Sequence, residues 1–205
     1  MKLLKYFTLV LLILSCKNEE AQIMQHGYFN SSTREFNSTR INWRIIVPEK
    51  WQITTIDTIK SQLERGLDKI ELKKSDDHLK HNINISYLIA FNKNNRNSFT
   101  AFLDEAQYEK ANFEKVTRNS KNVLLEQLEK QGIKADTTWS KKRISDIDFD
   151  VFDLLIDIPN TENDFHQQYY NTFIDDKYLT ILIGYDNSED KTELLKTLNT
   201  SSFIK

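Results

Sequence analysis

The chain has 205 residues, with 28 Lys and Arg against 30 Asp and Glu, which gives a formal net charge of −2. This near balance argues against the strongly basic surface of nucleic-acid-binding proteins, and we expect no nucleic-acid partner. A chain of this length suits a single domain with its own hydrophobic core. The sequence contains one cysteine, so an intramolecular disulfide cannot stabilise the fold.

The N-terminus has the pattern of an export signal. Two early lysines precede an apolar run over residues 6–14. A membrane-spanning helix needs about 20 apolar residues, so this shorter run indicates a secretory signal peptide instead. The segment Ile13–Cys16 resembles the lipobox of bacterial lipoproteins. The resemblance implies cleavage between Ser15 and Cys16, with a lipid on the thiol of Cys16, which then becomes the N-terminus.

The position of Cys16 supports this interpretation. A lone cysteine at the end of an export signal is better explained by a lipid than by an intermolecular disulfide or a reactive thiol. Each buried methylene contributes about 0.8 kcal/mol, so several acyl chains on one residue give a durable membrane anchor. The alternative is an ordinary signal peptide that is cut elsewhere, with Cys16 discarded or free.

We expect a signal peptide at residues 1–15, a lipidated N-terminus with a flexible tether at 16–36, and a single α/β domain at 37–205. The tether is polar and has little apolar periodicity, and a short strand near Phe36 is the one element it suggests. Its start, Lys17–Glu20, resembles the short signal that sends some Gram-negative lipoproteins to the outside of the outer membrane; a solvated tether explains it equally well. The predicted location is the envelope of a Gram-negative bacterium, as an outer-membrane lipoprotein facing the periplasm or the surface.

The first part of the predicted domain combines strands with a helix. Apolar and polar residues alternate over 41–47, which is typical of a half-buried strand, and the same period of two recurs over 83–91. Between these strands, apolar residues at steps of three and four predict a helix over 57–72.

A helical rhythm then begins after Ser98, a good N-cap, and continues to Gly132, a natural helix stop. A helix of that length is unusual in a compact domain. We therefore expect a break near residues 117–120.

The last third is predicted to be rich in strands. The expected strands cover residues 137–144, 149–158, 167–174 and 177–185, the last two forming a hairpin that turns at Asp175 and Asp176. A closing helix follows over 189–198, and residues 201–204 end the chain as a short strand or plug.

This order of elements resembles the PsbP-like family, whose fold is shared by photosynthetic accessory proteins and many small bacterial lipoproteins. The resemblance is carried by Ile45–Trp51, the Ser98–Leu103 helix start, the Tyr178–Gly184 strand and the final Ser201–Phe203. It implies an α+β fold in which an antiparallel β-sheet is flanked by helices, an α/β/α sandwich. Members of the family are mostly non-enzymatic binding or assembly factors, so the resemblance implies a non-catalytic role.

His78 and His81 are weak candidates for a metal site. They lie three residues apart beside Asp76 and Asp77, and a helical turn would bring these ligand atoms together for zinc or copper. The sequence offers no third His or Cys at a useful spacing. A solvated polar loop is therefore favoured, and we expect neither a metal nor another cofactor.

The acidic segment Asp186–Asp190 resembles the start of a calcium loop. An EF-hand loop that began there would need Gly at its sixth position and Glu at its twelfth. The chain has Lys191 and Thr197 at these positions. Helix capping by Asn187 or Ser188 is the better interpretation.

The sequence predicts no catalytic residues. The acid pairs Asp104/Glu105 and Asp175/Asp176 are adjacent in the chain, whereas glycoside hydrolysis requires two carboxyls facing each other across a cleft. No Ser or Cys nucleophile has a base at a recognisable spacing, and the four glycines form no phosphate-binding loop.

Three tyrosines, Tyr169, Tyr170 and Tyr178, cluster at the predicted hairpin. Neighbours in a strand point to opposite faces, so Tyr169 or Tyr170 is expected outside the core. Core packing is one explanation of the cluster; a patch for a ligand or protein partner, where tyrosine is favoured, is the other.

Thr58 and Thr137 lie in Asp-Thr-Ile and Asp-Thr-Thr segments that resemble a short O-glycosylation sequon of some Gram-negative bacteria. Three-residue matches of this kind arise easily by chance.

Together these features predict a lipid-anchored envelope protein that acts by binding or scaffolding and not by catalysis. They leave the ligand unidentified, and a protein of the envelope is one candidate partner. One alternative is an immunity-type lipoprotein that neutralises a toxin or lytic enzyme. The other is an envelope hydrolase or metal-dependent enzyme, which would need a concave pocket with converging polar groups.

Overall fold

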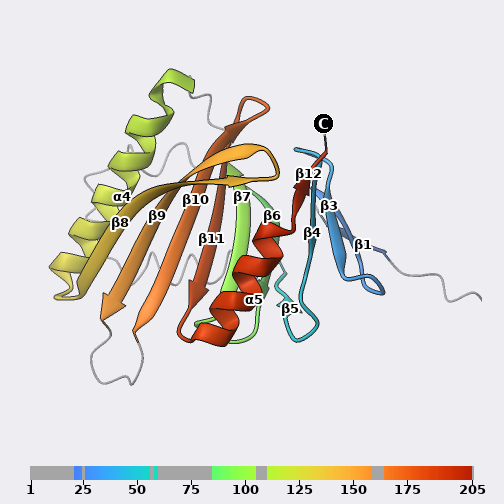
Figure 1. Ribbon diagram of the computed structural model, residues 1–205, viewed down its shortest axis with the longest axis horizontal. Helices are drawn as coiled ribbons and strands as arrows, with labels where there is room; N and C mark the ends of the chain where they lie inside the picture. Colours follow the sequence, from blue (N-terminus) through green and yellow to red (C-terminus); the bar gives the residue numbers. More distant parts are fainter. Residues whose placement is uncertain are drawn as a thin grey trace, which may run out of the picture.

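The computed structural model describes residues 21–24, 26–55, 58–59, 85–104, 110–157 and 164–204, which form two antiparallel sheets and the helices α4 and α5 (Figure 1). The smaller sheet contains, in spatial order, β1 (Ala21–Met24), β2 (Gly27–Asn30), β3 (Glu35–Ser38), β4 (Trp43–Ile46) and β12 (Ser202–Phe203). The larger sheet contains β5 (Gln52–Ile53), β6 (Ile85–Asn92), β7 (Ser98–Asp104), β11 (Lys177–Tyr185), β10 (Phe165–Ile174), β9 (Ile147–Asp157) and β8 (Lys134–Ile144). The helices are α4 (Phe113–Lys130), preceded by the 3-10 turn η1 (Lys110–Asn112), and α5 (Ser188–Asn199).

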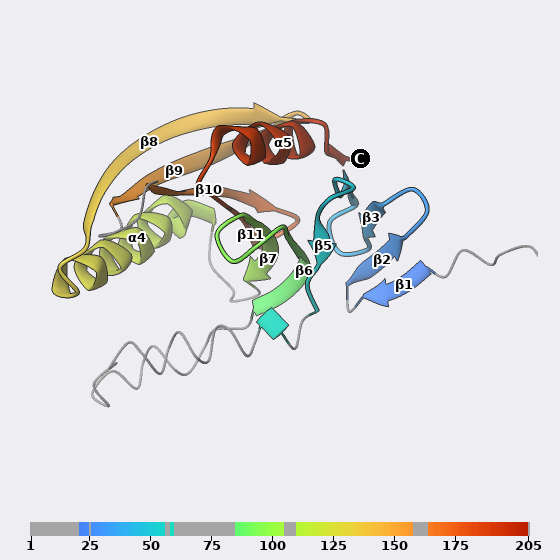
Figure 2. The same ribbon diagram turned by 90° about the horizontal axis from the view of Figure 1, so that it is seen from below.

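Both faces of the larger sheet are covered. Successive residues of β9 point to opposite faces, and apolar residues occur on each. Val151 points to one face, where it shares a core with Leu194 of α5 and with the smaller sheet. The neighbouring Phe152 points to the other face, where Leu124 of α4 packs. The two helices therefore lie on opposite sides of the larger sheet (Figure 2).

Aromatic rings join the two sheets. Trp43 of β4 is 1% exposed and stacks on Phe99 of β7 at 6.3 Å between ring centroids and on Phe203 of β12 at 5.8 Å. Phe99 in turn stacks on Phe91 of β6 at 4.6 Å. The smaller sheet and α5 thus share one face of the larger sheet, and this shared layer holds most of the core.

The predicted α+β fold, an antiparallel sheet flanked by helices in an α/β/α sandwich, is wrong. The described residues are mostly strand, and a second antiparallel sheet stands beside α5 where a helical layer was expected. Two stretches account for the difference. The sequence analysis predicted a helix for one and a tether for the other, and both form strands.

Residues 98–104 are the first stretch: they were predicted as the start of a helix and form β7. Phe99, Ala101 and Leu103 are each fully buried, with partly buried residues between them, which is the period of a strand. The apolar residues in this stretch satisfy the helical and the strand period at once. Pairing with β6 on one side and β11 on the other decides for the strand.

The second stretch is the predicted tether. Strands β1 and β2 lie within residues 16–36, and β2 pairs with β3 and β3 with β4. Gly27 shows how tightly these strands pack, because a Cβ there would lie 2.4 Å from the carbonyl oxygen of Asn37 and 2.7 Å from the ring of Phe36.

Helix α4 also differs from its prediction. The expected break at 117–120 is wrong, since α4 runs without interruption from Phe113 to Lys130. Its predicted stop is confirmed: Gly132 has φ +71°, and the amide of Ile133 donates to the carbonyl of Leu128 at 3.0 Å. Of the helix predicted at 57–72, only residues 58–59 are described, and they are helical.

Other predictions are confirmed. The alternating stretches form β4 and β6, and the four strands of the last third form β8 to β11. The β10–β11 hairpin turns at Asp175 and Asp176, both with positive φ. The closing helix is α5, and the terminal residues 202–203 pair with β4.

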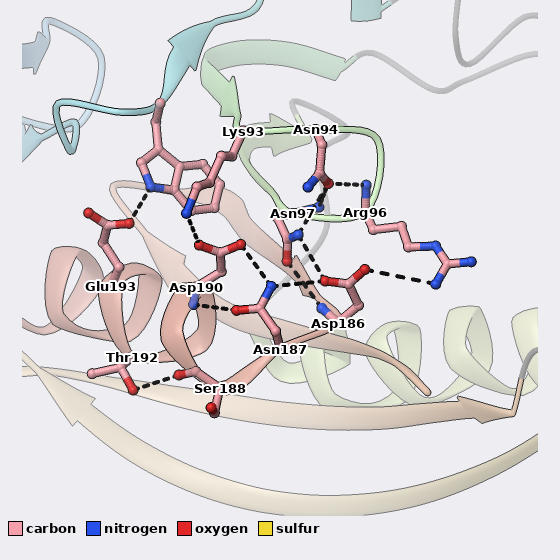
Figure 3. Close-up of polar contacts among 11 residues, drawn as sticks. Lys93, Asn94, Arg96, Asn97, Asp186, Asn187, Ser188, Asp190, Thr192 and Glu193 are labelled. Atoms are coloured by element: carbon pink, nitrogen blue, oxygen red, sulfur yellow. Dashed lines mark hydrogen bonds and ion pairs between the residues drawn. The ribbon is translucent and has the colours of Figure 1, made fainter. Parts of the chain in front are cut away.

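The start of α5 is fixed to the loop between β6 and β7 by polar contacts (Figure 3). Asn187 caps the helix, as predicted, because its Oδ1 accepts from the backbone amide of Asp190 at 2.8 Å. The carboxylate of Asp190 is buried and forms an ion pair with Lys93. It also accepts from Nδ2 of Asn187 at 2.9 Å, so both of its oxygens are engaged.

Asn97 extends these contacts along the same loop (Figure 3). Its Nδ2 donates to Oδ1 of Asp186 at 2.9 Å, and its Oδ1 accepts from the amide of Asp186 at 3.1 Å. Oδ1 of Asn94 accepts from the amide of Asn97 at 2.8 Å, which closes the loop. On the next turn of α5, Glu193 accepts from the indole of Trp51 at 2.7 Å.

A Gly27→Ala substitution distinguishes a sheet from a tether. The added Cβ collides with backbone and ring atoms, so we expect the free energy of unfolding to fall by about 1–3 kcal/mol. Chemical unfolding followed by circular dichroism measures the change. Gly132→Ala is the matched control, because a Cβ there meets nothing within 4 Å and only its positive φ is strained. Unchanged stability of Gly27→Ala would contradict the pairing of β2 with β3.

Asp190→Ala should destabilise the protein by about 1–3 kcal/mol, because it leaves the partners of a buried carboxylate without an acceptor. Burial raises the pKa of Asp190, but the hydrogen bonds from Lys93 and Asn187 outweigh burial, and the net pKa is lowered. The contribution is therefore present above the ordinary carboxyl pKa and is lost as the pH falls through the lowered value. Unfolding of the variant and of Glu189→Ala, an exposed acid in the same turn, at neutral and acidic pH tests this. A destabilisation by Asp190→Ala that is as large in acid as at neutral pH would contradict the prediction.

Candidate functional site

A groove lies between α4 and the strands β8 and β9. Its volume is about 240 Å³. It is lined by Glu114, Thr117 and Arg118 of α4, by Trp139, Ser140 and Lys141 of β8, and by Asp150 of β9. An aromatic wall combined with a few polar groups is the usual composition of a binding site, and this groove is the candidate functional site.

The periods of helix and strand bring these side chains together. Glu114, Thr117 and Arg118 are three and four residues apart and so share one side of α4. Trp139 and Lys141 are two residues apart in β8 and share a face of the sheet. Lys141 is directly opposite Asp150 in the register of β8 and β9.

Trp139 forms the aromatic wall. Its side chain is 37% exposed, and one part of the ring packs on Phe152 at 4.8 Å between centroids. The guanidinium of Arg118 lies 5.0 Å from the centroid of the indole, within the range of a cation–π contact. The Arg118 side chain is itself positioned by Oε1 of Glu114, which accepts from its Nε and Nη2 at 3.2 and 3.0 Å.

The charges of the groove are balanced. The Glu114–Arg118 pair belongs to α4, and the Lys141–Asp150 pair, at 3.6 Å, belongs to the sheet. Exposed pairs of this kind add little to stability. They hold charged groups of both signs at the mouth of the groove, and each carboxylate already faces a cation, so the arrangement suits polar contacts to a partner better than proton transfer.

A buried polar chain supports the floor of the groove. The hydroxyl of Thr117 lies 2.9 Å from the hydroxyl of Tyr178, which donates to Oδ1 of Asn171 at 3.1 Å. Thr180 donates to the same oxygen at 3.2 Å. Burial raises the pKa of Tyr178 to about 12. The phenol therefore remains a neutral donor at physiological pH, and the chain fixes α4 over the sheet.

Lys121 lies one turn further along α4 and is buried. Its Nζ is 3.5 Å from the centroid of the Tyr169 ring and 6.0 Å from that of Phe152. Burial lowers the pKa of Lys121 to about 7, while the ring face favours the ammonium form. Lys121 does not line the groove, and its contacts join α4 to β9 and β10.

Several residues singled out from the sequence lie outside the described part of the chain: Ser15, Cys16, His78, His81 and Glu105. Within the described residues, no group of three or more His, Cys, Asp or Glu side chains is placed to hold a metal ion. Thr58 and Thr137 are both exposed.

The structure does not bring the three predicted tyrosines together. Tyr169 points to the α4 side, next to Phe152, whereas Tyr170 points to the opposite side, where its hydroxyl donates to Gln168 at 3.0 Å. Tyr178 is buried under α4. Tyr169 and Tyr170 do lie on opposite faces, as expected, but Tyr169 is half-buried and Tyr170 is buried, so neither stands outside the core.

The sequence analysis missed Arg118 and Trp139. A signal for Trp139 was present, because it is the only aromatic residue in a strand whose other residues are mostly Thr, Ser, Lys and Arg. A Trp in such a strand must either be covered by another element or remain exposed. Here α4 covers it only in part.

The acidic residues considered earlier have local roles. Asp175 and Asp176 form a hairpin turn, and Asp186 and Asp190 are engaged in the contacts at the start of α5. Helix capping is thus confirmed as the role of the 186–190 segment.

Comparison with protein-family models and with curated proteins finds no match to this sequence. Over the described residues, none of the helices combines the length and apolar character that crossing a bilayer requires.

The protonation of Lys121 predicts a pH dependence. Its pKa is lowered on folding, so the unfolded chain binds more protons between about pH 7 and the ordinary lysine pKa. The free energy of unfolding should therefore rise with pH in this interval, by up to about 1.4 kcal/mol per pH unit, and Lys121→Met should remove that rise. Urea unfolding at several pH values measures it, with Lys130→Met on the exposed side of α4 as control. Parallel profiles for the wild type and Lys121→Met would mean that the ring contact keeps the amine protonated.

Proposed function

We propose that this protein is a lipid-anchored protein of the bacterial envelope that binds a protein partner along the edge of β8, with Trp139 and the groove as the anchor point, and that it does so without catalysis. The membrane attachment is supported by the lipobox-like Ile13–Cys16 segment after a signal-peptide pattern. The binding role is supported by the open edge of β8 beside the groove.

Strand β8 ends the larger sheet. It pairs with β9 on one side, and the described residues supply no strand on the other. It has eleven residues, eight of them exposed. A long edge strand with free backbone groups is a template for an extended segment of another chain, and strand addition is a common mode of peptide recognition.

The distribution of charge along β8 favours pairing with a partner strand at one part of this edge. Lys141, Lys142 and Arg143 occupy one end of the strand, where positive side chains oppose unspecific pairing between sheets. The neutral segment Thr137–Ser140 precedes them. Trp139 lies within it and points into the groove, so a partner strand that pairs there would find an aromatic anchor beneath it.

Trp139 and Arg118 belong to the residue types that dominate binding energies at interfaces. They contact each other and are partly exposed, and the Thr117–Tyr178 chain holds the helix that carries Arg118. Such a preorganised pair loses little conformational entropy on binding.

A photo-crosslinking amino acid at Thr137, which is exposed and shares the Trp139 face of β8, tests the proposal in the full-length, lipidated protein in intact cells. We expect one predominant protein adduct, lost in Trp139→Ala and in Ser140→Lys, which extends the cationic run into the neutral segment. With the partner purified, Trp139→Ala should weaken affinity by at least about 30-fold, equivalent to about 2 kcal/mol.

The matched controls are a crosslinker at Thr192 and a Thr192→Lys variant, because Thr192 is exposed on α5, on the other side of the larger sheet. Equal adducts at Thr137 and Thr192, or an adduct unaffected by Trp139→Ala, would contradict the proposed edge. A toxin or lytic enzyme as the adduct would identify the protein as the immunity type.

A further inference from the structure

The outer face of the smaller sheet exposes an apolar set. Five large apolar side chains are exposed among the described residues, and three belong to this face: Tyr28 at 46%, Ile46 at 50% and Ile204 at 58%. The other two, Val123 and Trp139, lie on α4 and β8. Isolated apolar side chains at a surface need no explanation, but three on one small sheet do.

The register of the sheet places these side chains on one face. Residues directly opposite in neighbouring strands share a face, and Tyr28 is joined through Asn37 to Arg44 in this way. Arg44 and Ile46 are two apart in β4, so they also share this face. The intervening Ile45 is buried in the core on the inner side.

Ile204 extends the same face at the C-terminal edge. It follows Phe203, whose ring stacks on Trp43 in the core, so by alternation Ile204 points outward. Its amide donates to the carbonyl of Asn42 at 2.8 Å, which keeps it beside β4.

The two charged side chains at the centre of this face pair with each other. Arg44 contacts Glu35 at 2.6 Å, and both lie between the apolar side chains. A surface with a tyrosine, two isoleucines and a neutralised ion pair resembles the composition of protein surfaces at the membrane–water interface, where amphipathic rings and apolar tips sit at headgroup level.

The distance from the proposed lipid to this sheet is short. Four residues separate Cys16 from Ala21, the first residue of β1, so even a fully extended chain spans at most about 18 Å between them. Ala21 is opposite Asn30, which is opposite Glu35, which is opposite Ile46. Three strand spacings, about 14 Å, therefore separate Ala21 from Ile46.

We propose that the outer face of the smaller sheet lies against the lipid bilayer, with Tyr28, Ile46 and Ile204 in the headgroup region. This inference rests on the lipidation of Cys16 proposed above. An anchor so close to β1 keeps the face at the membrane surface, where burial of the three side chains adds to the lipid's own affinity.

This orientation directs the proposed partner site away from the membrane. The smaller sheet lies at one end of the long axis, and α4 and β8 lie toward the other (Figure 1). The edge of β8 would thus face the aqueous side of the anchored protein, accessible to a partner in the periplasm or outside the cell.

The single cysteine of the chain makes the test direct. With the thiol of Cys16 occupied by lipid, a cysteine introduced by Tyr28→Cys, Ile46→Cys or Ile204→Cys can be labelled alone with an environment-sensitive fluorophore. Glu126→Cys, exposed on α4, is the control. The purified lipidated variants are placed in vesicles of phosphatidylethanolamine and phosphatidylglycerol that contain lipids with a quencher near the headgroup. Mass spectrometry first verifies the acyl groups on Cys16.

We expect quenching at the three sheet positions to exceed that at Glu126 by at least about threefold. Equal quenching with Cys16 acylated would overturn the membrane-facing orientation and leave the anchor standing. An unmodified Cys16 would overturn the anchor and the orientation together. Shielding of the three probes that persists in detergent, without a bilayer, would indicate a second copy on this face and would also overturn the inference.

Discussion

The stacking of Trp43 between Phe99 and Phe203 is the contact on which the rest of the structure depends. It joins β4 of the smaller sheet, β7 of the larger sheet and the terminal strand β12 in one buried layer. Aromatic rings at this junction bury a large apolar area. The smaller sheet covers part of one face of the larger sheet, and α5 covers the rest of that face. Helix α4 covers the opposite face.

This division of faces gives the molecule two different surfaces. On the α4 side, the helix and the strands β8 and β9 form a groove, where the Arg118 guanidinium lies over the Trp139 indole. On the far side of the smaller sheet, no described element covers the exposed Tyr28, Ile46 and Ile204. One surface is polar with a single aromatic anchor, and the other is apolar around a neutral ion pair. This difference is the reason that we propose a protein partner for the first and a lipid surface for the second.

Elements with one dominant local signal could be predicted from the sequence. The β10–β11 hairpin was found because Asp175 and Asp176 tolerate the positive φ that a two-residue turn needs. Helix α5 was found because Asn187 is a strong N-cap. Residues 98–104 were missed because their apolar positions fit two periods, and only pairing with distant strands selects one. Strands β1 and β2 were missed because a strand of four residues is too short to show a clear alternation.

The candidate site was harder to predict than the fold. Arg118 and Trp139 come from a helix and a strand whose relative placement depends on packing of Leu124 and its neighbours against β9. The three tyrosines gave the opposite error: they are close in sequence and were considered as one patch, yet the alternation of a strand separates Tyr169 from Tyr170, and Tyr178 is buried. Closeness in sequence indicates a shared surface only when the period of the element is respected.

The smaller sheet is assembled from the two ends of the chain. Its first four strands come from residues 21–46, and its fifth strand, β12, comes from residues 202–203. Contacts between such distant segments form late and slowly, because the intervening loop must first be closed. For the exported protein that we propose, this delay would keep the native core incomplete until residues 202–203 are available to pair with β4.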